Sequence, residues 1–272
     1  MGFTLRPLIL KTPITILFVI VFILDLQAQH FTHDIGVFVG TTSLQSDYGE
    51  RGNFASEWNN NGMSYSAVHY LSFYNRTLRW DPHNVLHQHL MIKTELHYLS
   101  NTELIHHGKW AKRNSEAALK LRAMKGSLRM LSLGVNLEYH LQSLGEFVYP
   151  YSDLWFDPFA TFGIKYSSFT TGLSSDLGDW QKDISVLPQK YTLKNALDIG
   201  TTEAFSVELG FGSRFKITPK IDLVTQFAYQ YFFSDKIDGL QAEVFENKNN
   251  DWLLNIQFGL VYHLNFNTPL FY

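Results

Sequence analysis

The clearest pattern in the chain is the alternation of apolar and polar residues from Phe205 to Ile217. Every odd position except Ser213 is apolar, and the even positions are polar, charged or Gly. Because side chains alternate faces along a strand, one face is hydrocarbon and the other holds Glu208, Arg214 and Lys216. A soluble sheet covers its apolar face with a second layer, whereas a transmembrane barrel turns that face to lipid. The segment is therefore typical of a barrel strand.

Related patterns recur along the chain and predict an all-β fold, an eight-stranded antiparallel transmembrane β-barrel with long extracellular loops. The second predicted strand is the weakest, because Tyr65 to Tyr74 is apolar on both faces. The predicted strands lie near residues 33 to 44, 64 to 75, 89 to 102, 128 to 142, 155 to 169, 204 to 217, 222 to 234 and 251 to 266.

The lengths of the connections agree with this topology. If the chain enters from the periplasm, the first, third, fifth and seventh connections face outward, and they are longer than the inward ones. The last inward connection is a tight turn from Thr218 to Ile221. Long extracellular loops and short periplasmic turns are typical of outer-membrane barrels. Within the third connection, helix-like spacing between Trp110 and Met124 predicts a short surface helix.

The N-terminal segment predicts export. Arg6 and Lys11 precede an apolar run from Ile14 to Leu24, which is roughly half as long as a membrane-spanning helix needs to be. Ala28 supplies the small residue of a cleavage site. We therefore expect a signal peptide over residues 1–28 and an outer-membrane β-barrel over residues 29–272, with an uncleaved anchor helix as the alternative.

Composition narrows the classes of function. The chain contains no cysteine, which excludes disulfides, thiolate nucleophiles and cysteine-held metals. A net charge of −3 gives no sign of nucleic-acid binding. The 22 Phe and 14 Tyr suit aromatic girdles at membrane interfaces. We expect outer-membrane lipid as the surroundings, no nucleic-acid partner and a monomeric barrel.

The predicted interior is charged. An eight-stranded barrel is just wide enough for side chains to fill, and buried charges are costly unless they are paired. We therefore expect a plugged lumen held by ion pairs and no steady conductance, with a catalytic or proton-conducting role as the alternative. The charged or imidazole side chains predicted to point inward are Lys93, Glu95, His97, Glu138, His140, Lys165, Glu208, Arg214 and Lys216.

Two groups of histidines are candidate metal ligands, because imidazoles at close spacing bind zinc or nickel. Asp81, His83, His87 and His89 lie near the second connection, and His106 and His107 lie in the third. The topology places these two connections on opposite membrane faces. A shared metal site is therefore not expected.

The remaining candidate groups lie in the outward loops. Asp47, Glu50 and Arg51 suit either a cation or, more simply, a salt bridge between loops. Ser100, His106 and Asp47 contain the residue types of a hydrolase triad, but nothing in their spacing brings them together. We therefore assign no catalytic, cofactor-binding or metal-binding residue, expect no cofactor and predict that the protein is not an enzyme.

Several segments resemble a family of uncharacterised secreted Bacteroidetes proteins of similar length. The matching segments are His33 to Gly40, Ser46 to Arg51, Ala123 to Ser127, Ser234 to Leu240 and Asn249 to Leu253. At its first strand, that family is similar to PorG, a small outer-membrane barrel associated with type IX secretion. Some members carry a glutamate dehydrogenase label, which this chain does not support, because it has no glycine-rich phosphate loop between a strand and a helix.

The resulting expectation is a small non-porin outer-membrane barrel that acts as a structural or interaction protein, accessory to an envelope or secretion complex. Binding would lie in the long outward loops or in the shorter periplasmic connections. The alternatives are an outer-membrane enzyme acting on lipid A or peptides and, third, a narrow channel.

Overall fold

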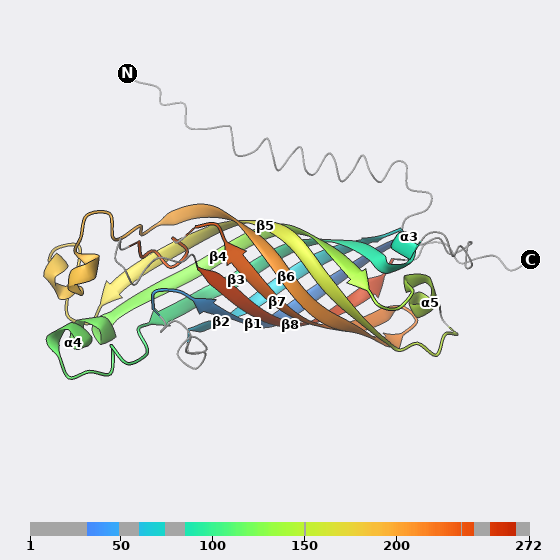
Figure 1. Ribbon diagram of the computed structural model, residues 1–272, viewed down its shortest axis with the longest axis horizontal. Helices are drawn as coiled ribbons and strands as arrows, with labels where there is room; N and C mark the ends of the chain where they lie inside the picture. Colours follow the sequence, from blue (N-terminus) through green and yellow to red (C-terminus); the bar gives the residue numbers. More distant parts are fainter. Residues whose placement is uncertain are drawn as a thin grey trace, which may run out of the picture. The chain divides into compact units, whose positions relative to one another are not determined.

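The computed structural model describes residues 32–48, 60–73, 85–149, 151–234, 236–241 and 251–264. Eight antiparallel strands form a closed barrel in which each strand pairs with the next and β1 pairs with β8 (Figure 1). The predicted fold class is confirmed, whereas the signal peptide at residues 1–28 lies outside the described residues. The strands are β1 (Thr32–Gln45), β2 (Asn61–Ser72), β3 (Leu90–Ile105), β4 (Met124–His140), β5 (Phe156–Ser175), β6 (Thr201–Thr218), β7 (Ile221–Phe232) and β8 (Trp252–His263).

The alternation seen in the sequence separates the two faces of the barrel wall. In β4, Asn136 and Glu138 are buried, whereas Val135 is 40% exposed and Leu137 is 45% exposed. The same division holds in β2, the strand with the weakest pattern, where Ser64 and Ser66 point inward. In these parts of the wall, polar side chains therefore point inward while apolar ones cover the outside, the reverse of a soluble protein.

The outer surface of the barrel is apolar and indicates that the barrel lies in a membrane. Exposed apolar side chains on the strands include Val37, Leu131, Ile164, Phe211 and Phe258. From Leu131 on β4 to Leu141, the residue after this strand, the outward positions are apolar. They span roughly 25 Å along the axis of a tilted barrel, which is the height of the apolar band in outer-membrane barrels. The closed wall leaves no unpaired strand edge in lipid. The protein is located in the outer membrane.

No helix among the described residues is long and apolar enough to cross a membrane.

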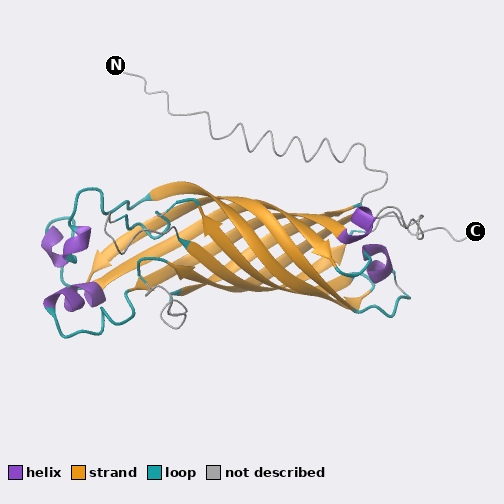
Figure 2. Cartoon of the chain, viewed as in Figure 1, coloured by secondary structure: helices purple, strands orange, loops and turns teal. Residues whose placement is uncertain are grey.

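Connections of unequal size lie at the two ends of the barrel (Figure 2). We call the end with the connections β1–β2, β3–β4, β5–β6 and β7–β8 the loop end, and the end where β1 begins and β8 finishes the terminal end. At the loop end, α4 (Glu116–Ala123) confirms the predicted helix and is capped by Ser115, whose hydroxyl accepts from Ala118 N at 3.2 Å. The β5–β6 connection adds η2 (Ile184–Val186) and η3 (Gln189–Tyr191).

The terminal end differs from the prediction. The tight turn between β6 and β7 is present, but the other two connections carry the helices α3 (Val85–His89) and α5 (Leu144–Val148). The buried side chains of α5, Leu144, Phe147 and Val148, enter the lumen. This insertion explains why the connection is longer than a simple periplasmic turn.

The strands β3, β4, β5 and β6 are longer than predicted at the loop end. Their extra outward positions include Lys125, Ser127, Thr170 and Thr201 in place of apolar residues. A reading based on an apolar outer face ends these strands too early, because hydrogen-bonded pairing continues after the side chains become polar.

Two apolar layers lie inside the barrel, separated by polar side chains. The loop-side layer includes Leu44, Leu104, Met130, Phe169 and Phe232. The terminal-side layer includes Phe38, Val68, Met91, Phe147 and Phe159. Between these layers the inward positions carry a polar layer, which contains most of the predicted charged residues.

Candidate functional site

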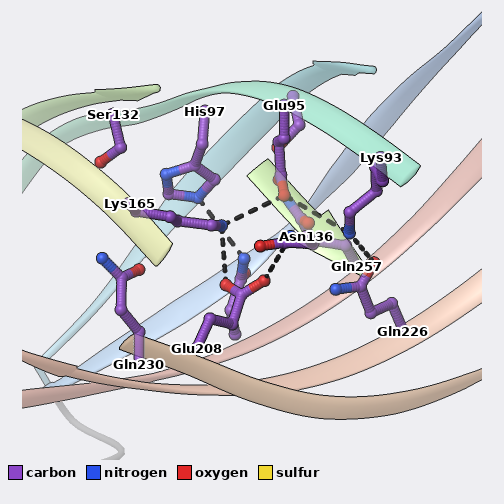
Figure 3. Close-up of polar contacts among 12 residues, drawn as sticks. Lys93, Glu95, His97, Ser132, Asn136, Lys165, Glu208, Gln226, Gln230 and Gln257 are labelled. Atoms are coloured by element: carbon purple, nitrogen blue, oxygen red, sulfur yellow. Dashed lines mark hydrogen bonds and ion pairs between the residues drawn. The ribbon is translucent and has the colours of Figure 1, made fainter. Parts of the chain in front are cut away.

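The polar layer is built around two buried lysines that share carboxylates (Figure 3). Lys165 Nζ from β5 lies 2.6 Å from Glu208 Oε2 and 3.1 Å from Glu95 Oε2. Lys93 Nζ from β3 lies 3.4 Å from both Glu95 Oε2 and Glu138 Oε1. All five side chains are almost completely buried, so each charge depends on these partners.

Neutral side chains bind the second carboxylate oxygens of Glu95 and Glu208 and contact Lys93 (Figure 3). Asn136 Nδ2 donates to Glu208 Oε1 at 2.9 Å, and Ser66 Oγ donates to Glu95 Oε1 at 2.7 Å. Gln226 Oε1 accepts from Lys93 Nζ at 2.8 Å, while Gln257 Nε2 donates to Ser66 Oγ at 2.9 Å. Several strands thus contribute to one hydrogen-bonded group, which holds the lysines and carboxylates in fixed positions.

A glycine makes room for this arrangement. A Cβ at Gly163 would clash with Asn136 Oδ1 and would lie 2.6 Å from the carbonyl oxygen of Val135. Any side chain at this position would therefore displace Asn136 from Glu208. The inward glycine is a requirement of the polar layer and not only of the strand.

A second charged group, the Arg214 cluster, lies toward the terminal end. Arg214 NH1 lies 3.7 Å from both Asp34 Oδ2 and Asp222 Oδ2, and its guanidinium lies 4.2 Å from the centre of the Tyr70 ring. His263 contacts the same two aspartates, with Nδ1 2.9 Å from Asp34 Oδ1 and Nε2 3.0 Å from Asp222 Oδ2. The imidazole satisfies both carboxylates when both nitrogens carry a proton.

His140 links the Arg214 cluster to the polar layer. Its Nδ1 lies 2.7 Å from Asp157 Oδ2, and its Nε2 lies 3.5 Å from Glu138 Oε2. Glu138 in turn faces Lys93 at 3.4 Å and Arg214 NH2 at 4.0 Å. The charges therefore extend from mid-barrel to the terminal end, and the loop-side apolar layer lies beyond them toward the loop end.

The structure brings most of the predicted interior residues together. Lys93, Glu95, Glu138, Lys165 and Glu208 form ion pairs as expected. His97 is buried beside Asn255, whose Nδ2 lies 3.4 Å from its Nε2. Of the three remaining members of that prediction, Arg214 forms the Arg214 cluster and His140 links this cluster to the polar layer.

Lys216 is the exception, because its assignment to the interior ion pairs is wrong. Its Nζ donates to the carbonyl oxygen of Tyr149 at 3.2 Å and lies 5.2 Å from the centre of the Phe147 ring. It sits near the terminal end, where the register between β6 and β7 shifts.

The predicted interior charges omit the aspartates Asp34, Asp157 and Asp222, and they omit His263 although the alternation of the last strand places it on the polar face. Each lies near a strand end but occupies an inward position. The parity of the alternation, extended to the last residue of each strand, is the signal that would have found them.

A cap closes the loop end through contacts between connections. Asp198 N donates to Gly239 O at 3.0 Å, and Lys236 Nζ lies 2.8 Å from Asp198 Oδ2. His107 N donates to Tyr48 O at 3.0 Å. The cap thus joins the first, third, fifth and seventh connections over the loop-side layer, since Asp47 N also donates to Asp238 Oδ2 at 2.9 Å.

His106 lies inside this cap between two tyrosines. Its ring centre is 4.6 Å from that of Tyr48 and 5.9 Å from that of Tyr191. Burial, with Lys190 and His107 nearby, lowers the pKa of His106 to about 3. Burial also raises the pKa of Tyr48 and of Tyr191 well above the ordinary value. The neutral forms of all three side chains are therefore favoured here.

This placement separates the residues of the hydrolase triad. Ser100 Oγ donates to Met63 O at 2.9 Å at an exposed position, whereas His106 is buried in the cap. Asp47 bonds through its backbone to Asp238. Ser100 and His106 therefore do not form a nucleophile and base, and Glu50 and Arg51 lie outside the described residues.

The candidate metal ligands are not assembled either. His89 Nδ1 lies 2.8 Å from the carbonyl oxygen of His140, and the ring of His87 stacks near Phe73. His106 and His107 lie at the opposite end, and Asp81 and His83 fall outside the described residues. Within the described part of the chain, no group of three or more His, Asp or Glu side chains has the geometry of a metal site.

One hollow of about 490 Å³ lies on the outer surface across β4 to β7. Its lining includes Leu137, Phe162, Leu209, Phe211 and Tyr229. These side chains belong to the apolar band, so the hollow faces hydrocarbon.

No protein-family model and no curated sequence matches the chain. Solved structures with similar folds include Ail, the attachment invasion locus protein of Yersinia pestis, at 12% identity and a TM-score of 0.40, covering 87% of this chain and 100% of Ail. A major outer membrane protein from Thermus thermophilus has 13% identity and a TM-score of 0.46, covering 85% of this chain and 99% of that protein.

The outer membrane enzyme PagL has 14% identity and a TM-score of 0.35, covering 84% of this chain and 98% of PagL. At such low scores and identities none of these proteins bears on the function of this chain. Function must be argued from its own residues.

Proposed function

We propose that the protein is a non-conducting outer-membrane barrel that acts as a structural or interaction protein through its loop end. The observation that carries this proposal is the filled lumen, in which a paired polar layer lies between two apolar layers. A selectivity filter needs a ring of charge along a water-filled path, whereas here cations and carboxylates neutralise one another at contact distance. A filled interior with paired charges favours a rigid structural barrel over a transport channel.

Conductance in planar bilayers tests the first half of the proposal. The purified wild-type barrel should insert without steady current, and Phe147→Ala, which thins only the terminal-side layer, should also remain closed because the loop-side layer is untouched. Stable ion-selective channels from the wild type would overturn the proposal and favour the narrow channel.

The loop end supplies the surface for interaction. The β5–β6 connection exposes Leu177, Ile184 and Leu193 on a segment held by its own turns and by the cap. Exposed apolar side chains on a fixed segment suit protein contact. The resemblance to Bacteroidetes barrels and to PorG supports a partner within an envelope or secretion complex, and we propose that the barrel itself is a monomer.

Affinity purification from native outer membranes, followed by mass spectrometry, tests this partner. Leu177→Asp and Ile184→Asp at the loop end should each reduce recovery of a stoichiometric partner. Tyr151→Asp, which alters a highly exposed side chain at the terminal end, is the matched control and should retain it. Loss with Tyr151→Asp alone would move the binding surface to the periplasmic connections.

The proposed function is not enzymatic. One arrangement by which an enzyme acts on lipid A or peptides is a nucleophile beside a general base at an accessible rim. The separation of Ser100 from His106 removes the one triad that the sequence offered.

A further inference from the structure

The strands β3 to β6 form a wall that continues beyond the apolar band at the loop end. On β4 the outward residues change from Leu131 to Arg129, Ser127 and Lys125. On β5 they change from Tyr166 to Ser168 and Thr170, and β6 begins with Thr201 and Glu203. We call these outward residues the polar wall. Its lower edge meets the apolar band, at the depth where lipid headgroups lie.

Arg129 occupies the centre of a row across this wall. It pairs in register with Thr170 on β5, which pairs with Thr201 on β6. The two threonine hydroxyls lie 3.1 Å apart and are exposed. An arginine in the same row as two exposed threonines offers donors to an oxyanion at one level above the hydrocarbon.

The neighbouring charges of the wall are already engaged. Lys125 Nζ lies 2.9 Å from Asp176 Oδ2, and Glu203 accepts a hydrogen bond from the hydroxyl of Tyr166. Arg129 is exposed and, among the residues that the structure describes, forms no ion pair with a carboxylate. It is therefore available to an anion from outside the chain.

Positive charge continues upward from Arg129 into the β3–β4 connection. The chain as a whole has a net charge of −3, yet residues 101–129 are basic. Trp110 is 53% exposed there, with the Arg113 guanidinium 3.9 Å from the centre of its ring. The basic residues of this segment are Lys109, Lys112, Arg113, Lys120, Arg122, Lys125 and Arg129, and the acidic ones are Glu103 and Glu116.

We propose that the polar wall binds the phosphorylated saccharide headgroup of an outer-leaflet lipid, with Arg129 contacting a phosphate. The depth of Arg129 in the membrane favours a lipid as the ligand, because this residue lies just above the apolar band that contacts the acyl chains. The charge selects an anion, and a planar guanidinium matches two phosphate oxygens. The basic connection and Trp110, farther from the membrane, lie along the path of a saccharide that stands on the lipid.

The test compares the full-length barrel in three kinds of vesicle, each with a phosphatidylcholine background. One contains lipopolysaccharide, one contains enzymatically dephosphorylated lipopolysaccharide, and one contains phosphatidylglycerol. Lipid retained on the purified protein is counted by native mass spectrometry. We expect the wild type to retain the phosphorylated lipopolysaccharide in preference to the other two lipids. Arg129→Gln should retain at most roughly one fifth as much of it, and Arg129→Lys an intermediate amount.

Lys182→Gln is the matched control, because Lys182 is 85% exposed at the same end and pairs with Asp179 at 3.1 Å. It should retain lipid like the wild type, and heat-modified migration should show that every variant is folded. Inorganic phosphate in solution should not displace the lipid. Equal retention of the dephosphorylated lipid, preference for phosphatidylglycerol, displacement by phosphate, or an unchanged Arg129→Gln variant would each overturn the proposal. The proposal rests on the orientation proposed above, with the loop end outside, but not on the absence of conductance, which is measured separately.

Discussion

The inner and outer faces of the same strands handle charge in opposite ways. On the inner face of β5 and β6, Lys165 and Glu208 are buried at 2.6 Å from each other. On the outer face, one residue away, Ile164 and Leu209 are exposed and apolar. A charge inside is stable only with its partner, whereas a charge outside is costly according to its depth in lipid. The alternation in the sequence therefore encodes two different environments at once.

Among the changes that test this difference between the two faces, removal of one inner charge should reduce the stability of the barrel most. Glu208→Ala leaves Lys165 with Glu95 alone and leaves Asn136 without its acceptor. We expect a loss of about 3 to 5 kcal/mol in the free energy of unfolding, toward the lower end because Glu95 remains. Urea-induced unfolding in lipid vesicles measures it. The double variant Glu208→Ala with Lys165→Met should recover part of the loss, and strictly additive losses would mean that the pair is not coupled.

Addition of an outer charge should cost slightly less. Phe211→Arg, at a side chain 63% exposed to lipid, and Val135→Arg should each lose about 2 to 4 kcal/mol near the midplane. Ser174→Arg, on the outer face of β5 beyond the apolar band, is the matched control and should be close to neutral. Equal losses at all three positions would show that depth in lipid is not the cause.

Asn136→Arg is unsuitable as an inward control, although Asn136 occupies an inward position of β4. Asn136 is buried, bonds Glu208 and packs against Gly163, so a larger cation would meet a filled interior. It would escape the lipid penalty but incur one from overpacking.

Acid should weaken the cap through His106. Its folded pKa of about 3 lies below the unfolded value, so the neutral ring contributes stability that is fully present above the unfolded pKa and is lost as the pH falls toward 3. Between pH 7 and pH 5 the loss should be about 2 kcal/mol. Hydrogen exchange of cap amides measures local opening. In His106→Phe the loss of cap stability between pH 7 and pH 5 should disappear. The same pH dependence of exchange in this variant as in the wild type would show that His106 is not its cause.

The smallest expected effect concerns a single hydrogen bond of the polar layer. Ser66→Ala removes the 2.7 Å hydrogen bond to Glu95 and should cost about 1 to 2 kcal/mol. Ser100→Ala, which removes an exposed bond on the outer face, should cost less than about 0.5 kcal/mol. Thermal unfolding in detergent compares the two, and an equal cost would mean that burial does not strengthen the interior bond.

The strands were predictable from the sequence, because the alternation of polar and apolar residues within each strand shows which side chains face inward. The parity of Glu208 and Lys165 placed them inside, and the structure pairs them. The lengths of β3 to β6 were not predictable in this way, because backbone pairing such as Arg129 with Thr170 does not require an apolar outer face.

Contacts between distant segments could not be predicted from the sequence either. The cap depends on pairs such as Leu197 with Leu240, which no local pattern signals. The insertion of Phe147 into the lumen likewise depends on space left by inward side chains of other strands. The candidate binding residue Arg129 became visible only once the height of the apolar band on its neighbours was known.

The contact between Asp34 and His263 also has a consequence for assembly. These residues lie opposite each other on β1 and β8, the strands whose pairing closes the ring, and Asp222 on β7 shares the imidazole. Sliding β8 by one residue would turn its side chains to the wrong face, and sliding it by two residues in one direction would place Val261 against Asp34. Ring closure in the wrong register would therefore remove the imidazole from Asp34 and Asp222 and leave the more distant Arg214, at 3.7 Å, as their cation. The contacts of Asp34 and His263 thus favour one register of β1 against β8 over the others.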